Sequence, residues 1–185
     1  MRMFRGIGHQ TTGVAKKQKE HNFIRSELFP QSIRLALIID GSNMFMRSYH
    51  APTYQPFTNR AGQKSGAIYG TLKSIISEVR LWKPSFVYFV LDQTGSKRKK
   101  LLHEGYKATR GHGLVGTAHS VDMNLMEQKA EYESKQRQLD TLREMLPNLG
   151  IRFCAIPEYE ADDVIGAITT VHSFSVISST DTDFI

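Results

Sequence analysis

Residues 33–40 read IRLALIID, an apolar run that ends in an aspartate. The run is rich in aliphatic and β-branched residues and too short for a typical core helix, so it predicts a buried β-strand. Similar runs follow at 86–91 (FVYFVL), 151–156 (IRFCAI) and 174–177 (FSVI). Helical patterns lie between them at 65–82, at 122–149, where one helix or two would fit, and at 161–171. Such alternation predicts an α/β fold, a parallel sheet with helices on both faces.

Length and composition limit the class of protein. The chain has 185 residues, of which 40% are hydrophobic, enough for one globular domain with a tail. No apolar run approaches the roughly 18 residues that cross a bilayer, and the first residues lack a secretory signal. We therefore expect no membrane partner and a cytoplasmic location, with an organellar one left open. The single cysteine, Cys154, excludes an internal disulfide and a cysteine-rich zinc site.

The positive charge is distributed unevenly along the chain. The net charge is +6, and residues 1–30 supply +4 of it, from six basic and two acidic residues. This segment has no sustained apolar period, so we expect a basic, mostly disordered extension over 1–30 and a folded domain over 31–185. The acids and bases of the domain are themselves segregated, and their positions indicate its chemistry.

Acidic residues follow each of the four predicted strands. The carboxyl ends of parallel strands meet at one edge of a sheet, where ligands bind. Any one acid could simply cap a turn or a helix. Seven of them crowded together would repel one another unless cations neutralised them, and oxygen-only ligands favour Mg²⁺ or Mn²⁺. These seven candidate metal ligands are Asp40, Asp92, Glu160, Asp162, Asp163, Asp181 and Asp183.

A basic stretch follows the second strand directly. Residues 95–110 read GSKRKKLLHEGYKATR and contain six basic residues and one acidic residue. A cation-rich segment beside a carboxylate-held metal is what a nuclease needs, because the metal binds phosphate oxygens and activates water while the cations attract the polyanion. A stacking ring among cations suits single-stranded nucleic acid. The candidate DNA-binding residues at this edge are Arg47, Tyr49, Lys97, Arg98, Lys99 and Lys100.

At these residues the chain resembles the 5'-nuclease family, which comprises the 5'→3' exonuclease domain of bacterial DNA polymerase I, phage 5'-exonucleases and flap endonucleases. The resemblance runs from about Leu35 to the last residue. The matching segments, in order, are LALIIDGSNMFMRSYHA (35–51), GAIYGTLKSI (66–75), FVLDQTG (89–95) with EGYKATR (104–110), PEYEADDVIGAI (157–168) and VISSTDTDFI (176–185).

The resemblance implies roles for individual residues. The seven acids would be metal ligands, some directly and some through water, in a site that holds two ions in a complete family member. Tyr106, Lys107 and Arg110 would lie on a helical gateway over the active site. Lys107 would stabilise charge on the scissile phosphate, Arg110 would grip a phosphate and Tyr106 would stack on a terminal base. Gly66 and Gly70 match small positions where a helix approaches DNA or packs closely.

Two departures from the family pattern affect these expectations. Glu158 stands where family members commonly have glycine, so we expect a different turn before Glu160. The sequence also ends at Ile185, before the family's later aspartate pair and its helix-hairpin-helix region. We therefore expect a domain truncated at its C-terminus, weak activity alone, and a separate C-terminal nuclease polypeptide as a possible partner.

The sequence predicts a metal-dependent 5'→3' exonuclease or flap endonuclease that acts on DNA with a 5' end, flap or branch. Three alternatives remain. A non-catalytic DNA-binding remnant would bind branched DNA without needing Asp92 or Asp181. A PIN-like ribonuclease would share the acidic parallel sheet but prefer RNA. A phosphoaspartate phosphatase would use the Asp-x-Asp pair that starts at Asp181, but this reading leaves Asp40 and Asp92 unexplained.

Overall fold

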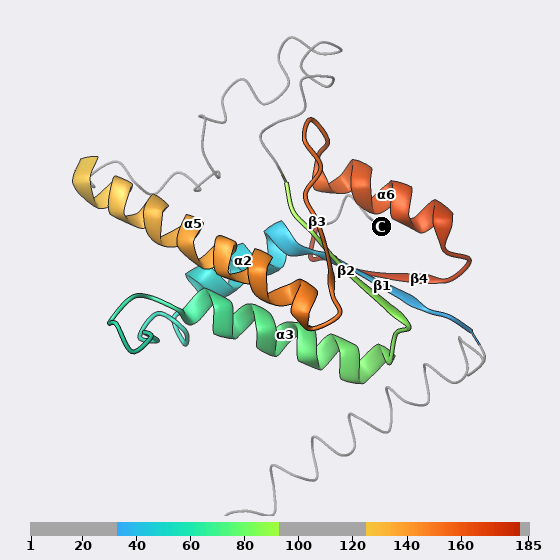
Figure 1. Ribbon diagram of the computed structural model, residues 1–185, viewed down its shortest axis with the longest axis horizontal. Coiled ribbons are helices and arrows are strands. Elements are labelled where there is room, and N and C mark those ends of the chain that lie inside the picture. The colour runs from blue at the N-terminus through green and yellow to red at the C-terminus, as the bar shows by residue number, and fades with distance from the viewer. Residues whose placement is uncertain (1–32, 93–124, 182–185) are drawn as a thin grey trace, which may run out of the picture.

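A computed structural model describes residues 33–92 and 125–181 of the chain (Figure 1). Their strands form one parallel sheet in the order β3-β2-β1-β4. The strands are β1 (Ala36–Asp40), β2 (Phe86–Val90), β3 (Arg152–Cys154) and β4 (Ser175–Ser178). Each lies within a few residues of a predicted apolar run, so the predicted parallel sheet is confirmed.

Helices pack on both faces of the sheet, as predicted (Figure 1). α3 (Gly66–Trp82) and α6 (Ala161–Val171) match the expected helices closely. α5 (Leu125–Asn148) is continuous, with Pro147 in its last turn. None of the helices in the described ranges is long and apolar enough to cross a membrane.

The sequence analysis missed one helix, α2 (Gly41–His50). It begins directly after β1, where Asp40 is its N-cap residue and accepts a hydrogen bond from the backbone N–H of Asn43. Its buried residues include Met44, Phe45 and Tyr49, which share one face of the helix. The glycine, serine and asparagine of its first turn resemble a loop and hide this pattern.

β1 is the centre of the fold because it pairs with β2 on one side and with β4 on the other. All five of its residues are buried, as expected of a parallel strand covered on both faces. Leu37 and Ile39 contact the helices α2, α3 and α5, whereas Ile38 faces Val164 and Ile165 of α6. Burial of each such side chain contributes about 1.5 to 3 kcal/mol.

The order of the strands creates a switch point beside β1. The chain moves from β1 to β2 and β3 in one direction and then returns to place β4 on the opposite side of β1. The strand order therefore reverses between β1 and β4, and in parallel sheets ligands bind at the carboxyl ends of the strands at such a point. Ile39 pairs with Ser178 at this end, so the residues after both strands meet there.

Candidate active site

Asp40 lies at the switch point and has only 7% of its surface exposed. Its Oδ1 accepts a hydrogen bond from Asn43 N at 3.0 Å, and its Oδ2 accepts one from Ser179 Oγ at 2.8 Å. Burial raises the pKa of the Asp40 carboxyl, and the charges of Asp92 and Asp181 add to the rise, while the two hydrogen bonds oppose it. The fold thus places Asp40 in surroundings that disfavour the charged form of its carboxyl group.

Asp92 follows β2 and connects two elements of the site. Its Oδ1 accepts a hydrogen bond from Ala161 N, the first residue of α6, at 2.8 Å. Its own backbone N–H donates to Ser42 Oγ at 2.9 Å. The N-terminus of α6 therefore faces this carboxylate, and a helix N-terminus stabilises negative charge.

The residues after β4 complete a hydrogen-bonded group with the first turn of α2. Ser179 Oγ accepts a bond from Asp181 N at 3.0 Å while donating to Asp40. Thr180 Oγ1 donates to Asn43 Oδ1 at 2.7 Å. The sequence analysis assigned no role to Ser42, Asn43, Ser179 or Thr180. Small polar residues beside strand-end aspartates were the signal that could have identified them.

Glu160, Asp162 and Asp163 all lie at the start of α6. Glu160 is its N-cap residue and is 3% exposed, whereas Asp162 and Asp163 are exposed in the first turn. The Glu160 backbone N–H donates to Asp163 Oδ2 at 3.3 Å as part of a capping box. Asp163 therefore has a structural role at this helix end. The Glu160 side chain in turn accepts from the backbone of Asp163, so both carboxylates take part in the cap of α6.

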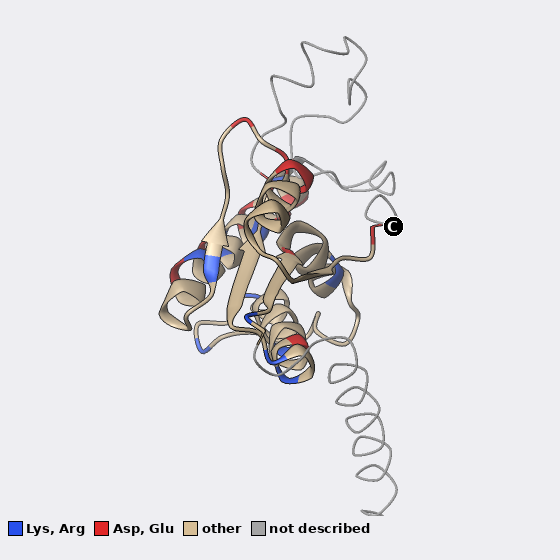
Figure 2. Ribbon diagram, turned by 90° about the vertical axis from the view of Figure 1, so that its right-hand side faces the viewer, with Lys and Arg blue, Asp and Glu red and all other residues tan. Residues whose placement is uncertain are grey.

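Acidic residues gather where α6 begins and where the described chain ends, at the carboxyl end of the strands (Figure 2). The charges of Asp92 and Asp181 both contribute to the raised pKa of Asp40. Across 33–92 and 125–181, however, no three Asp, Glu, His or Cys side chains form a ready-made metal cage. Asp183 lies outside the described residues. The donors are all oxygens, and a divalent cation would relieve their repulsion, so the residues present fit a hard metal ion.

The predicted cations of the basic stretch, Lys97, Arg98, Lys99 and Lys100, lie outside the described residues, as do Tyr106, Lys107 and Arg110. Arg47 is described and is exposed on α2. Its position on the helix, seven residues beyond Asp40, places its backbone about 10 Å further along the axis.

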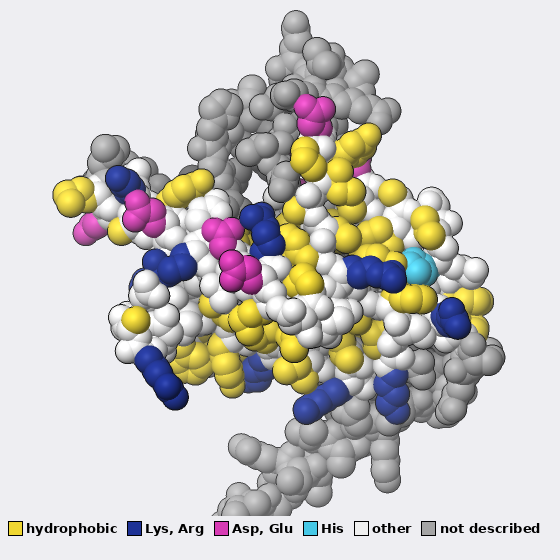
Figure 3. Space-filling model, in the orientation of Figure 1, with side chains coloured by type: hydrophobic (Ala, Val, Ile, Leu, Met, Phe, Trp, Pro, Cys, Tyr) yellow, Lys and Arg dark blue, Asp and Glu magenta, His cyan; other side chains and the backbone are white. Residues whose placement is uncertain are grey.

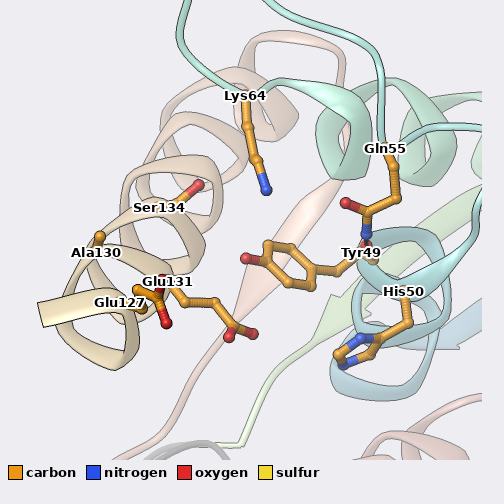
Figure 4. Close-up of a pocket in the computed structure, with 8 residues that line it drawn as sticks. All are labelled: Tyr49, His50, Gln55, Lys64, Glu127, Ala130, Glu131 and Ser134. Atoms are coloured by element: carbon orange, nitrogen blue, oxygen red, sulfur yellow. Dashed lines mark hydrogen bonds between the residues drawn. The ribbon is translucent and has the colours of Figure 1, made fainter. Parts of the chain in front are cut away.

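Tyr49 does not present a free ring at the edge of the sheet. It is 8% exposed, and Lys135 Nζ lies 4.9 Å from its ring centroid. Lys135 is itself buried and pairs with Glu131 at 2.7 Å. The remaining surface of Tyr49 lines a hollow of about 610 Å³ between the end of α2, the segment after it and α5 (Figure 4). Tyr49 lies in the last turn of α2, so its ring packs in the core rather than beside Asp40. The sequence analysis did not predict α2 and therefore did not predict this position.

Gly66 and Gly70 serve close packing between α3 and the preceding segment. A Cβ on Gly66 would lie 1.9 Å from the Tyr54 carbonyl oxygen. One on Gly70 would lie 2.6 Å from the Tyr54 ring and 2.9 Å from Ser48 Cβ. Both positions therefore require glycine for steric reasons inside the domain.

Glu158 has a φ of +71°, in the left-handed region that favours glycine. The backbone before Glu160 thus adopts the conformation expected of the glycine that the family pattern has there. A non-glycine residue in this conformation costs roughly 1 to 2 kcal/mol.

A second polar cluster lies on the α6 side of the sheet, away from the aspartates. Tyr88 Oη is 2.8 Å from His172 Nε2 and also accepts a hydrogen bond from Arg152. The Arg152 guanidinium lies over the rings of Phe86 and Tyr88, at 5.1 and 5.2 Å. The face of the molecule seen in Figure 3 also exposes hydrophobic side chains. Ile156, two residues after the end of β3, is one of the exposed hydrophobic residues of the domain.

A parallel sheet with a buried carboxylate at its switch point defines an α/β domain with a candidate ligand site at the carboxyl ends of its strands. Residues 35–185 match the family of the 5'-3' exonuclease N-terminal resolvase-like domain. The chain belongs to this family.

Relatives with known names agree with this assignment. The chain is 31% identical over 134 residues to a 5'-3' exonuclease of Buchnera aphidicola subsp. Acyrthosiphon pisum, covering 72% of this chain and 40% of that protein. It is 29% identical over 128 residues to a 5'-3' exonuclease of Aquifex aeolicus, with coverage of 69% and 37%. It is also 26% identical over 136 residues to DNA polymerase I of Mycobacterium leprae, with coverage of 74% and 13%.

The fold also matches a solved structure, that of the T5 D15 protein co-crystallized with metal ions. The TM-score is 0.60 at 20% sequence identity, and the match covers 82% of this chain and 51% of that one. This likeness confirms the architecture. The chain spans about half or less of the length of the proteins it matches.

Proposed function

We propose that this domain hydrolyses DNA phosphodiester bonds near 5' ends, as the carboxylate-bearing part of a 5'→3' exonuclease or flap endonuclease. The observation that carries the proposal is Asp40, a buried carboxyl with a raised pKa beside Asp92 and Asp181. A buried carboxyl at the ligand-binding edge of a sheet, beside other acidic groups, is a candidate functional group.

Seven acids would hold Mg²⁺ or Mn²⁺, some directly and some through water: Asp40, Asp92, Glu160, Asp162, Asp163 and Asp181, which are described, and Asp183. A bound divalent ion would supply charge neutralisation at the scissile phosphate and would lower the pKa of a water. The protein's own part is to hold the carboxylates in place. Asn43 and Ser179 fix Asp40, and the N-terminus of α6 fixes Asp92.

The basic stretch 95–110, with Lys107, Arg110 and Tyr106, is proposed to bind and orient the DNA. In the sequence it begins just after Asp92, the last described residue before it. The named relatives are more than twice as long as their matched parts. We propose that full activity also requires the remaining part of the family architecture, on the same or a separate polypeptide.

The test is cleavage of a labelled 5'-flap DNA by the chain alone and by the chain with the C-terminal part of a related exonuclease. We expect Mg²⁺-dependent product that is lost in Asp40→Asn and Asp92→Asn but kept in Asp140→Asn, an exposed aspartate on α5. A matched RNA flap tests the ribonuclease alternative. Binding to flap DNA without cleavage, even with the partner, would instead support a DNA-binding remnant.

A further inference from the structure

Ser179 is placed so that one hydroxyl group joins two of the candidate metal ligands. It donates its single proton to Asp40 Oδ2 at 2.8 Å and accepts the Asp181 backbone N–H at 3.0 Å. Asp40 and Ser179 are 139 residues apart in the sequence and come from β1 and the end of β4. The hydrogen bond therefore crosses the switch point, where the proposed metal site lies.

Asp40 is held at both of its carboxylate oxygens. Asn43 N occupies one lone-pair position of Oδ1, and Ser179 occupies one of Oδ2. A carboxylate oxygen has about two such positions, so each keeps one for a ligand. Rotation of the group about its Cβ–Cγ bond would break both hydrogen bonds, so they fix its orientation.

A second connection runs parallel to the first. Thr180 Oγ1 donates to Asn43 Oδ1 at 2.7 Å, and Asn43 N in turn donates to Asp40. Asp40, Asn43, Thr180 and Ser179 thus form a closed ring of hydrogen bonds and peptide links. We call these four residues the switch-point ring. It joins the first turn of α2 to the residues that lead into Asp181.

The ring brings together groups that repel one another. The charges of Asp92 and Asp181 act unfavourably on Asp40, so the carboxylates would separate if nothing held them. A hydrogen bond to an ionised group contributes more than one between neutral groups. Ser179 is the residue of the ring that contacts both Asp40 and the backbone of Asp181.

We propose that Ser179 is a positioning residue for divalent metal binding, which sets the orientation of Asp40 and the distance between Asp40 and Asp181. This inference rests on the proposed function, because it assumes that these carboxylates hold a metal ion. Residues that orient metal ligands by hydrogen bonds typically change metal affinity about 10- to 100-fold when they are lost.

The experiment measures Mn²⁺ binding to the full chain by the electron paramagnetic resonance signal of free Mn²⁺, with circular dichroism to check folding. We expect Ser179→Ala to weaken Mn²⁺ binding about 10- to 100-fold while the folded fraction stays unchanged. Ser173→Ala, which removes an exposed serine just before the same strand, is the matched control and should bind as the unmodified chain does.

A second pair of variants separates the hydroxyl from packing. Ser179→Thr keeps the hydroxyl and Ser179→Val replaces it with a methyl group of similar shape. We expect Ser179→Thr to restore binding and Ser179→Val to remain weak. Equal Mn²⁺ affinity of folded Ser179→Ala and the unmodified chain, or of the Thr and Val variants, would overturn the role of Ser179.

The outcomes also distinguish the two proposals. If the unmodified chain binds no more Mn²⁺ than Asp40→Asn does, the metal site itself is refuted, and the role of Ser179 with it. If it binds Mn²⁺ and Ser179→Ala binds equally well, only the role of Ser179 is refuted.

Discussion

The two ends of α2 differ in what surrounds them. Its first turn, with Asp40 and Asn43, is polar and hydrogen-bonded to the residues after β4. Its last turn, with Tyr49, is packed among α3, α5 and the segment after α2 (Figure 4). Nine residues of helix separate Asp40 from Tyr49, or about 14 Å at 1.5 Å per residue. Closeness in sequence to the proposed metal ligand Asp40 therefore does not place a side chain beside it.

The largest expected effect is at the first turn. Asp40→Asn keeps a good N-cap residue for α2 but removes the charge that a metal would need. We expect Mg²⁺-dependent cleavage of 5'-flap DNA to fall by about 100-fold or more. Because the neutral side chain also avoids the cost of a buried charge, thermal unfolding should not shift downward. Unchanged cleavage by Asp40→Asn would remove this end of α2 from the active site.

The next effect is on packing near the last turn of α2. Gly66→Ala and Gly70→Ala introduce Cβ atoms that would clash with Tyr54, and with Ser48 for Gly70. We expect a loss of about 1 to 3 kcal/mol in the free energy of unfolding, as overpacking usually causes. Urea unfolding followed by circular dichroism measures it.

Gly166→Ala is the control for both glycine variants. This helical glycine of α6 has no atom within 4 Å of a Cβ, apart from its neighbours. Here alanine should stabilise the chain by roughly 0.5 to 1 kcal/mol. If Gly66→Ala and Gly70→Ala weaken DNA binding without reducing stability, then close approach to DNA explains these positions better than packing does.

A smaller effect is expected when the ring of Tyr49 is removed. Tyr49→Leu keeps an apolar side chain but loses the contact with Lys135, which is worth about 0.5 to 2 kcal/mol. Stability should fall by a similar amount while affinity for single-stranded DNA, measured by fluorescence anisotropy on folded protein, stays the same. If Tyr49 stacks on a base, as the sequence predicts, the substitution would instead cost about 1 to 3 kcal/mol of binding.

The smallest effect concerns pH. Burial raises the pKa of the Tyr49 hydroxyl above 10.0, and the charge of Glu131 adds to the rise. The folded state therefore holds this proton more tightly than the unfolded state does. Its contribution to stability is complete below about pH 10 and is lost as the pH rises through the folded pKa.

Urea unfolding of the unmodified chain and of Tyr49→Phe, at several pH values from 9 upward, isolates this contribution. The difference in stability between the two proteins should shrink or reverse as the pH increases, because phenylalanine has no proton to lose. A difference that is independent of pH would show that the hydroxyl is not buried in the way described.

The sequence allowed the sheet, the longer helices and the acids at the strand ends to be predicted, because apolar runs and strand-end charges follow from burial and topology. It did not allow α2 to be predicted, since Gly41 and Ser42 hide a helix start that Asp40 caps. The site's hydroxyl groups, such as Ser179, were equally hidden. Serine and threonine are common in loops, and only the pairing of distant strands shows which of them meet a carboxylate.

The pairing of β1 with β4 affects the order in which the parts of the domain can fold. Ala36 pairs with Ser175 across nearly the whole described chain, whereas β1 and β2 are much closer in sequence. Contacts between distant segments close large loops and tend to form late. During synthesis, β1, β2 and α3 leave the ribosome well before β4. Asp40 and the residues after β4 would then come together only once β4 has been synthesised and has paired with β1.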